Sequence, residues 1–400
     1  MADIPPDPTD PVQSTAVSAT HHSTAWSRAY EIAAGTPRPL PAESVTVERA
    51  AGRVLAAPLR AVRSVPAFDT AAMDGYAVTG PGPWTVTAQL LAGAPQPGPM
   101  RPGTAIEIAT GAVVPEGAEA ILPYEDSARD GTLVTGVLGA RAHIRRAGDD
   151  VRPGDELVPA GRPVNATVAA AAVQAGVERL MAHRAPGVTL LVTGNEVISA
   201  GVPGPGQVRD SFTGLVSAIA ARAGALPPAR RHVSDVAALL ESELAAARTE
   251  VVVVSGSSSA GAADHLHGVL DRLGAAWHVR GVACRPGHPQ ALAELPDGRW
   301  VVSLPGNPFA GLVAALTLLE PLLHALSGSP PAVLPTVPVR GTTRLMPYGV
   351  RIVPVHRGTP WHIAGPVSSA GLHAAARADG LAVLPGSWTD GDPAQILALP

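Results

Sequence analysis

Several acidic residues stand beside glycine in segments where the chain is expected to turn. Asp74 lies in AAMDGYAV (71–78), and Asp149 and Asp150 follow Gly148 in RRAGDDVRPGDEL (145–157). A carboxylate in a loop can bind a metal ion or handle a proton, but it is also an ordinary turn former. Considered one at a time, these acids predict no more than turns.

The stretch VVVVSGSSSAGAADH (251–265) combines a buried strand with a loop open to a ligand. Its four valines predict the strand, and the small residues after Gly256 allow close approach to the backbone. Asp264 would start the next helix, where a carboxylate is stabilising by itself, so a functional and a capping role are equally favoured. His265 and His267 are two residues apart on that helix. They point to different faces, which favours surface histidines over metal ligands.

From residue 185 onward, strands alternate with helices. Periodicity predicts a mostly parallel sheet covered on both faces, with Ser234 as the N-cap of one helix. Ligands bind at the carboxyl ends of such strands, where the loops TGNE, SGSSSAGAAD and LPGNP lie. Glu196 in TGNE is not needed for packing there. The strands are expected at 187–194, 250–256 and 299–306, and the helices at 211–224, 234–249, 263–274 and 308–328.

The remaining chain is predicted to be mostly β. Short alternating runs separated by Pro and Gly indicate an all-β module over 60–145 and a second one over 330–400. Helices are expected at 26–34 and 165–176, and 45–59 is expected to form a strand edge and then a helix ending near Gly52.

The composition predicts two to four domains with aliphatic cores, because 46% of the 400 residues are hydrophobic and only 3% aromatic. A net charge of −4 without a basic cluster speaks against nucleic-acid and membrane partners. All 29 basic residues are arginine, so any cation that holds an anion is a guanidinium. The one cysteine, Cys284, is expected to be buried. A single cysteine can form no disulfide within the chain, which fits a cytoplasmic protein. Residues 1–22 read as a disordered tail without an apolar signal segment.

Seven segments in this order resemble the molybdopterin molybdenumtransferase family, the molybdenum insertases that also form one domain of gephyrin. The resemblance covers about residue 26 to the end. Its segments are AFDTAAMDGYAV, ATGAVVPEGAEAI, RRAGDDVRPGDELVPAG, VTGNEV, GQVRDS, RPGHP and LPGNP.

The resemblance implies a multidomain α/β plus β fold. An elongated domain would be built from 23–59 and 145–184, with a β extension at 60–144. An α/β domain resembling the molybdopterin adenylyltransferase fold would span 185–329, and a C-terminal β domain 330–400.

The resemblance also implies an activity. Molybdate would be inserted into adenylated molybdopterin with release of AMP, assisted by a divalent cation, Mg²⁺. The protein would be a homodimer, with the active site between the α/β domain of one subunit and the β extension of the other. The molybdopterin adenylyltransferase and the downstream molybdoenzyme machinery are expected partners.

Functional residues carry over where this sequence matches the family motifs. Glu196 and Asp264 would also be the metal ligands. The catalytic set implied is Asp74, Thr110, Asp150, Glu196 and Asp264. The substrate-binding set implied is Gly256, Ser257, Ser259, Gly261, Arg285, Pro305, Gly306, Asn307 and Pro308.

The sequence departs from the family pattern at several positions. Ser257 replaces the second glycine of the binding loop, and Ser234 stands where an Asp is usual, so a carboxylate role there would be lost. Arg285 and His288 occupy places that usually hold lysines. Further departures are Ala71, Asn195, Phe212 and Ala262.

Two other hypotheses therefore stand beside the enzyme. The loop changes favour a diverged paralogue that binds molybdopterin but inserts metal poorly, while the retained acids favour an active insertase. A gephyrin-like scaffold is the weaker third possibility, since no long interaction domain is appended.

Overall fold

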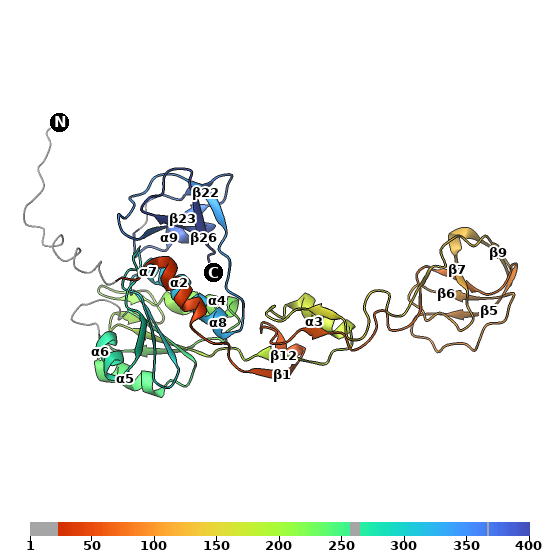
Figure 1. Cartoon of the computed structure of the whole chain (residues 1–400), viewed down its shortest axis with the longest axis horizontal. Coiled ribbons are helices and arrows are strands. Elements are labelled where there is room, and N and C mark those ends of the chain that lie inside the picture. Colours follow the sequence, from red (N-terminus) through yellow and green to blue (C-terminus); the bar gives the residue numbers. More distant parts are fainter. Residues whose placement is uncertain (1–22, 257–264, 366–367) are drawn as a thin grey trace, which may run out of the picture. The chain divides into compact units, whose positions relative to one another are not determined.

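The computed structural model describes residues 23–256, 265–365 and 368–400 (Figure 1). The chain divides into two compact units. The first comprises Met1–Glu43, Gly52–Ala56 and Ala182–Pro400, and the second Ser44–Ala51 and Ala57–Met181. Their elements give the predicted multidomain α/β plus β architecture. Each unit is described by itself.

A six-stranded sheet forms the centre of the first unit. Its first four strands pair in parallel, and the last two pairings are antiparallel because the fifth strand runs in the opposite direction to the others, so the predicted mostly parallel sheet is confirmed. The sequence pattern did not indicate three of these strands: Ala229–Val233, Ala291–Glu294 and Ala276–Val279. In spatial order the strands are β16 (Ala229–Val233), β13 (Val188–Thr193), β17 (Val251–Ser255), β21 (Trp300–Leu304), β20 (Ala291–Glu294) and β18 (Ala276–Val279).

The four valines of β17 explain how both sheet faces are buried. Side chains alternate along a strand, so Val251 and Val253 face one layer while Val252 and Val254 face the other. The first layer contains helices α2 (Trp26–Gly35) and α4 (Phe212–Arg222), together with the long helical stretch Pro308–Leu326. The second contains α5 (Ala237–Ala246) and α6 (Leu266–Arg272).

The helical stretch Pro308–Leu326 is interrupted by a wider turn. It consists of α7 (Pro308–Ala314), a π turn labelled η5 (Ala315–Leu319) and α8 (Glu320–Leu326). Pro321 has no N–H to donate, which explains the loosened ladder before it. The Thr317 hydroxyl donates to the Val313 carbonyl at 2.8 Å and accepts the Trp26 indole N–H at 3.0 Å.

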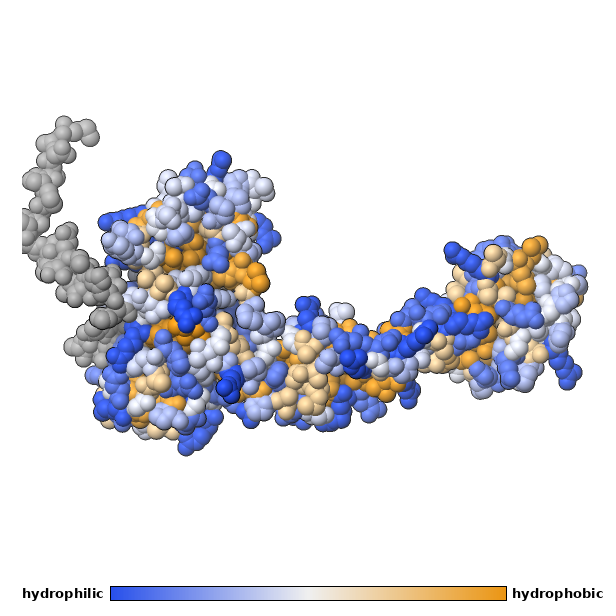
Figure 2. Space-filling view, viewed as in Figure 1, coloured by the Kyte–Doolittle hydropathy of each residue, from blue (hydrophilic) through white to orange (hydrophobic). Residues whose placement is uncertain are grey.

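This stretch is a core element. Among the described helices it alone is long and apolar enough to cross a membrane, yet 89% of its apolar window is buried inside the protein. On the face shown in Figure 2, hydrophobic and hydrophilic residues are interspersed. The apolar character of the stretch Pro308–Leu326 is therefore explained by packing against the sheet.

Two local predictions are wrong. Helix α5 begins at Ala237 with Val236 as N-cap, and Ser234 does not cap it, because the chain turns once more at Ser234. The segment 45–59 forms β1 (Ala42–Thr46) and one 3₁₀ turn, η3 (Glu48–Ala50), in place of a helix. The other predicted helices are present within a few residues.

The C-terminal part of the first unit forms a second six-stranded sheet, as predicted for 330–400. Its own core includes Val353, Leu384 and Trp388. The spatial order is β19 (Cys284–Arg285), β23 (Val350–His356), β24 (Trp361–Ile363), β22 (Thr336–Arg340), β26 (Pro393–Leu397) and β25 (Gly380–Pro385), and α9 spans His373–Ala376.

The second unit contains a third six-stranded sheet, as the alternating pattern of 60–145 predicts. Tyr76 and Val78 pack on one face and Ala77 on the other. The order is β7 (Ala120–Pro123), β4 (Gly75–Val78), β6 (Thr104–Ile108), β5 (Trp84–Leu90), β9 (Leu133–Gly136) and β8 (Ser127–Asp130). The remaining elements are β2 (Leu59–Arg60), β3 (Thr70–Ala71), η4 (Tyr124–Asp126), β10 (Ile144–Arg145), β11 (Glu156–Val158) and α3 (Ala166–Gln174), and the second unit ends within β12 (Arg179–His183).

Helix α3 offers a direct test of the fold. The Asn165 side chain accepts the N–H of Val168 at 2.9 Å and so caps the helix. Removing such a cap costs about 1 kcal/mol. We expect Asn165→Ala to lower the melting temperature of the transition that includes this unit, while Asn165→Asp, which keeps an acceptor, leaves it close to wild type. Equal melting of all three proteins would contradict the capping role.

Candidate functional site

The carboxyl ends of three central strands are in register. Val192 of β13 pairs with Ser255 of β17, which pairs with Leu304 of β21. Two hydrogen bonds join the loops that follow: the Gly256 N–H donates to the Leu304 carbonyl at 3.1 Å, and the Thr193 hydroxyl donates to the Ser255 carbonyl at 2.8 Å. The loops TGNE, SG and LPGNP therefore start side by side, as predicted.

Two glycines are required for this convergence. Gly256 has φ +106°, and a Cβ there would lie 2.7 Å from the Thr193 hydroxyl oxygen. Gly194 has φ +124°, and its Cβ would lie 2.8 Å from the Glu196 carboxylate. Both backbone angles are ones that side chains rarely adopt. The Glu196 carboxylate thus folds back over bare backbone.

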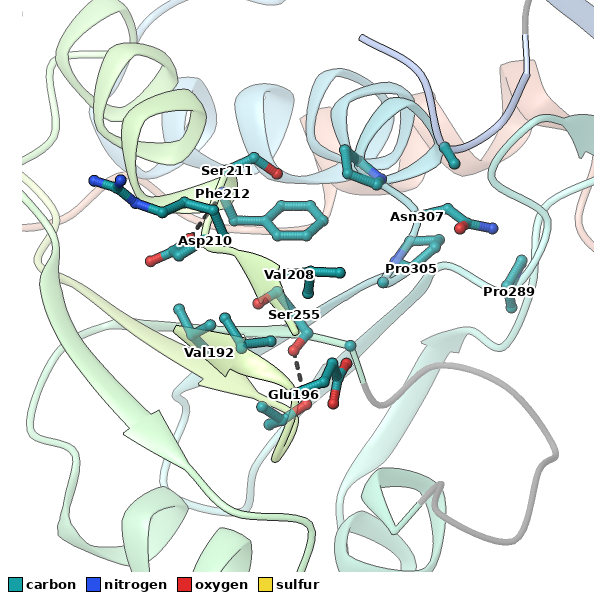
Figure 3. Close-up of a pocket in the computed structure, with 17 residues that line it drawn as sticks. Val192, Glu196, Val208, Asp210, Ser211, Phe212, Ser255, Pro289, Pro305 and Asn307 are labelled. Carbon is teal, nitrogen blue, oxygen red and sulfur yellow. Dashed lines mark hydrogen bonds between the residues drawn. The ribbon is translucent and has the colours of Figure 1, made fainter. Parts of the chain in front are cut away.

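A cavity of about 560 Å³ opens between these loops (Figure 3). Six residues predicted from the sequence line it: Glu196, Gly256, Pro305, Gly306, Asn307 and Pro308. The wall also contains residues that were not predicted as site residues, namely Val192, Thr193, Val197, Val208, Arg209, Asp210, Ser211, Phe212, Ser255, Pro289 and Ala370. The structure therefore gathers one predicted group around a single space large enough for a small ligand.

The loop that continues from Gly256 is the part of the predicted site outside the described residues. Ser257, Ser259, Gly261, Ala262 and Asp264 all fall there. Among the residues that the structure does describe, no three His, Cys, Asp or Glu side chains gather as metal ligands. Of the two predicted metal ligands, Glu196 lies among the described residues and Asp264 outside them.

The backbone N–H groups at the helix starts beside the cavity already donate to acceptors within the protein. The Ser369 carbonyl accepts the N–H groups of Phe309 and Ala310, both at 3.1 Å, at the start of α7. The Asp210 carboxylate accepts those of Phe212 and Thr213 at the start of α4, at 2.9 and 3.1 Å. These N–H groups are not available to a ligand anion. An anion must instead be held by other backbone N–H groups or by arginine.

Asp210 anchors one wall of the cavity. It pairs with Arg230 at 2.8 Å and accepts the Thr213 hydroxyl at 2.6 Å. Burial acts to raise its pKa, but the hydrogen bonds from Thr213, Arg230 and the backbone outweigh it and hold the pKa below the ordinary value of 3.8. The motif GQVRDS contained Asp210, but its burial and pairing with Arg230 depend on the fold.

Asp235 is an acid near the site that the sequence reading missed. Its carboxylate accepts the N–H of Asn195 at 3.1 Å, and its own N–H donates to the Asn195 side chain at 3.3 Å. Ser234, the preceding residue, was compared with the family's Asp, and Asp235 was not named. A carboxylate is thus retained beside the TGNE loop, and Asn195 is held by it.

Arg285 does not line the cavity but lies beside a second arginine. Strands β19 and β23 pair so that Arg285 stands opposite Arg351. Burial and the positive charge of Arg285 lower the pKa of Arg351, and the same two causes lower the pKa of His288. In the described part of the chain, the buried Arg351 Nε has no hydrogen-bond partner. Paired guanidinium groups in this state suit an anion.

Cys284 is buried as predicted, whereas His265 and His267, which were expected at the surface, are both half-buried. Cys284 is fully buried, and burial raises the pKa of its thiol to about 12, so it is no nucleophile. His267 stacks on Trp277 with ring centroids 5.0 Å apart. His265 is the residue before helix α6.

In the second unit, the structure brings Asp74 and Thr110 together. The Thr110 N–H donates to Asp74 Oδ1 at 2.6 Å. Hydrogen bonds from the backbone and side chain of Thr110 lower the pKa of the Asp74 carboxyl. The two predicted residues thus form one exposed group.

Asp150 is exposed in the same unit, and its N–H donates to the Val65 carbonyl at 3.0 Å. Its neighbour Asp149 closes the turn by accepting the N–H of Arg146 at 2.7 Å. Asp149 is therefore the turn acid, which leaves the carboxylate of Asp150 for another role.

The lowered pKa of Asp210 gives a pH-dependent prediction. Its contribution to stability is present above about pH 4 and lost as the pH falls through the folded-state pKa. We expect Asp210→Asn to lower the melting temperature at pH 7 and the difference from wild type to shrink toward pH 3. Glu31→Gln, in an exposed pair with Arg28, is the control. A difference that does not change with pH would contradict this account.

The arginine pair predicts an anion site. We expect Arg351→Ala to weaken binding of pyrophosphate about tenfold in a calorimetric titration, because a charged hydrogen bond is lost. Raised salt should weaken the wild type as well. Arg377→Ala, an exposed arginine elsewhere in the C-terminal sheet region, is the matched control. Equal affinities of wild type and Arg351→Ala would rule out the site.

Comparison with known proteins agrees with this arrangement. Residues 22–176 match a family described as the MoeA N-terminal region (domain I and II), and residues 189–325 match a probable molybdopterin binding domain. A molybdopterin molybdenumtransferase of Nostoc sp. is 31% identical over 305 residues, covering 72% of this chain and 70% of that protein. Molybdopterin molybdenumtransferase 2 of Mycobacterium tuberculosis is 33% identical over 310 residues, covering 72% and 76%.

A solved structure shows the same fold. The molybdopterin biosynthesis MoeA protein of Pyrococcus horikoshii superposes with a TM-score of 0.76 at 24% identity, covering 94% of this chain and 99% of that one. The matched segments include the cavity loops and the Asp74–Thr110 pair. The chain belongs to the molybdopterin molybdenumtransferase family.

Proposed function

We propose that this protein inserts molybdenum into molybdopterin in molybdenum cofactor biosynthesis. Molybdate would react with adenylated molybdopterin: the two dithiolene sulfurs would bind molybdenum while oxo groups of molybdate take up protons and leave as water. A water molecule would cleave the phosphate–phosphate bond and release AMP. The observation that carries the proposal is the cavity between the in-register strand ends, in the segment that matches a probable molybdopterin binding domain. Relatives named as molybdenumtransferases favour this activity over the binding-only alternative.

The cavity suits such a substrate in shape and chemistry. Pro305 and Phe212 provide apolar surface, while Glu196 brings a carboxylate to the same space. Arg209 lines the cavity wall, and so does Pro289, the last residue of the RPGHP segment. That segment begins at Arg285, which stands opposite Arg351 and with it adds positive charge outside the cavity lining. Substrate and molybdate are both anions, so guanidinium groups can position them while Glu196 accepts or donates a proton.

Other features of the family complete the proposal. We propose a homodimer in which Asp74, Thr110 and Asp150 of one subunit act with the cavity of the other. Mg²⁺ would take part, with Asp264 as a ligand besides Glu196. The four-domain division, cytoplasmic action and partnership with the adenylyltransferase and the downstream machinery remain proposals of the same kind.

Complementation tests the activity. The chain is expressed in a bacterium that lacks its own insertase, and nitrate reductase activity is assayed. We expect wild type to restore activity and Asp74→Ala, Glu196→Ala and Asp264→Ala to lower it on the order of a hundredfold, as loss of an acid–base or positioning group does.

Glu31→Ala is the matched control, because Glu31 is an exposed acid of the first unit outside the cavity. It should complement like wild type. If the wild type accumulates as folded protein and binds adenylated molybdopterin but does not restore activity, the insertase proposal fails and the binding-only alternative stands.

A further inference from the structure

An exposed tyrosine lies beside the Asp74–Thr110 pair. Tyr124 follows strand β7 directly and is 42% exposed, and its N–H donates to the Asp74 carbonyl at 3.3 Å. Its phenol is also within electrostatic reach of the Asp74 carboxylate, whose charge is one of the causes that raise the pKa of Tyr124. Tyr124 stands in the segment ILPYED (121–126), to which the sequence patterns assign no role.

Three contacts hold this ring in place. The Tyr124 hydroxyl donates to Glu107 Oε1 at 2.7 Å, and Arg129 donates to Glu107 Oε2 at 2.9 Å. The ring also packs against Tyr76 in an edge-to-face arrangement, with centroids 5.3 Å apart and planes at 84°. An exposed tyrosine is usually free to change rotamer. Here the contacts already order the Tyr124 side chain, so a ligand that binds to it loses little further side-chain entropy.

The same contacts decide what Tyr124 can offer a ligand. Burial and the hydrogen bond to Glu107 raise its pKa to about 12, so the phenol is neutral at physiological pH. Its proton is directed to Glu107, so the oxygen can only accept from a ligand, while the ring presents a π face. Both Glu107 oxygens are engaged, which argues against Glu107 as a cation ligand.

Strands β4 and β7 approach each other closely beside Asp74. A Cβ on Gly75 would lie 2.1 Å from the Leu122 carbonyl oxygen. Strand β4 therefore lies nearer to β7 than any side chain at this position would allow. This approach places the Asp74 turn against Tyr124.

We propose that Tyr124 is a substrate-binding residue that stacks on a flat nitrogen heterocycle carrying an amino group, next to Asp74 and Thr110. The inference rests on the proposed function, whose substrate carries two such rings, a pterin and an adenine. Stacking would hold the ligand ring on the face of Tyr124, and the phenol oxygen would accept a hydrogen bond from a donor on another part of the substrate.

The test uses full-length protein and adenylated molybdopterin. We expect Tyr124→Leu to raise Kd and KM about tenfold, as loss of one stacking contact does. Because stacking contributes equally to ground and transition states, kcat should stay within about twofold. Tyr124→Phe keeps the ring and should lose less affinity than Tyr124→Leu. Glu107→Gln should have an intermediate effect.

Tyr348→Leu is the matched control, since Tyr348 is a 79% exposed tyrosine of the first unit. AMP and 6-hydroxymethylpterin, titrated separately, identify the ring, because only the one that stacks loses affinity in Tyr124→Leu. Unchanged affinity for adenylated molybdopterin in Tyr124→Leu, with only a lower melting temperature, overturns the inference. Failure of the proposed function looks different: the wild type itself would not turn over this substrate.

Discussion

The alignment of three parallel strand ends determines the arrangement of the first unit's site. Val192, Ser255 and Leu304 occupy matched positions, so the loops after them emerge at one edge of the sheet. They can meet only because Gly256 has no side chain, as a Cβ there would collide with Thr193. The hydrogen bond from Thr193 to the Ser255 carbonyl then fixes the spacing. The cavity and the place of Glu196 follow from this close contact of backbones.

The helix starts beside the cavity do not offer free N–H groups for an anion. Helix N-termini commonly bind phosphate, but here Ser369 and Asp210 occupy N–H groups at the two described helix starts beside the cavity. Arg209 lines the cavity, whereas Arg285 and Arg351 lie outside its lining. In a chain without lysine, Arg285 and Arg351 form a fixed pair whose mutual repulsion an anion relieves.

Sequence reasoning recovered the elements that depend on local patterns. The valines of 251–254 and the Pro/Gly punctuation of 60–145 indicated buried and half-buried strands, and the structure has both. It also recovered six cavity residues, because motif order marked the loops. It could not find Arg351, whose partner across β19 and β23 is a matter of tertiary pairing. It did not name Asp235, because the two hydrogen bonds between Asp235 and Asn195 join residues 40 positions apart in the chain. Tyr124 was passed over because its contact with Glu107 joins separate strands.

The bare backbone at Gly256 allows the cavity loops to meet, and AMP release tests most directly whether the proposed activity depends on it. Purified protein is mixed with adenylated molybdopterin, molybdate is added, and AMP is measured. Wild type should release AMP when molybdate is added, and Gly256→Ala should not. Gly298→Ala, which has a similar φ of +85° but no atom within 4 Å of its Cβ, should behave like wild type. Wild-type AMP release by folded Gly256→Ala would contradict the account.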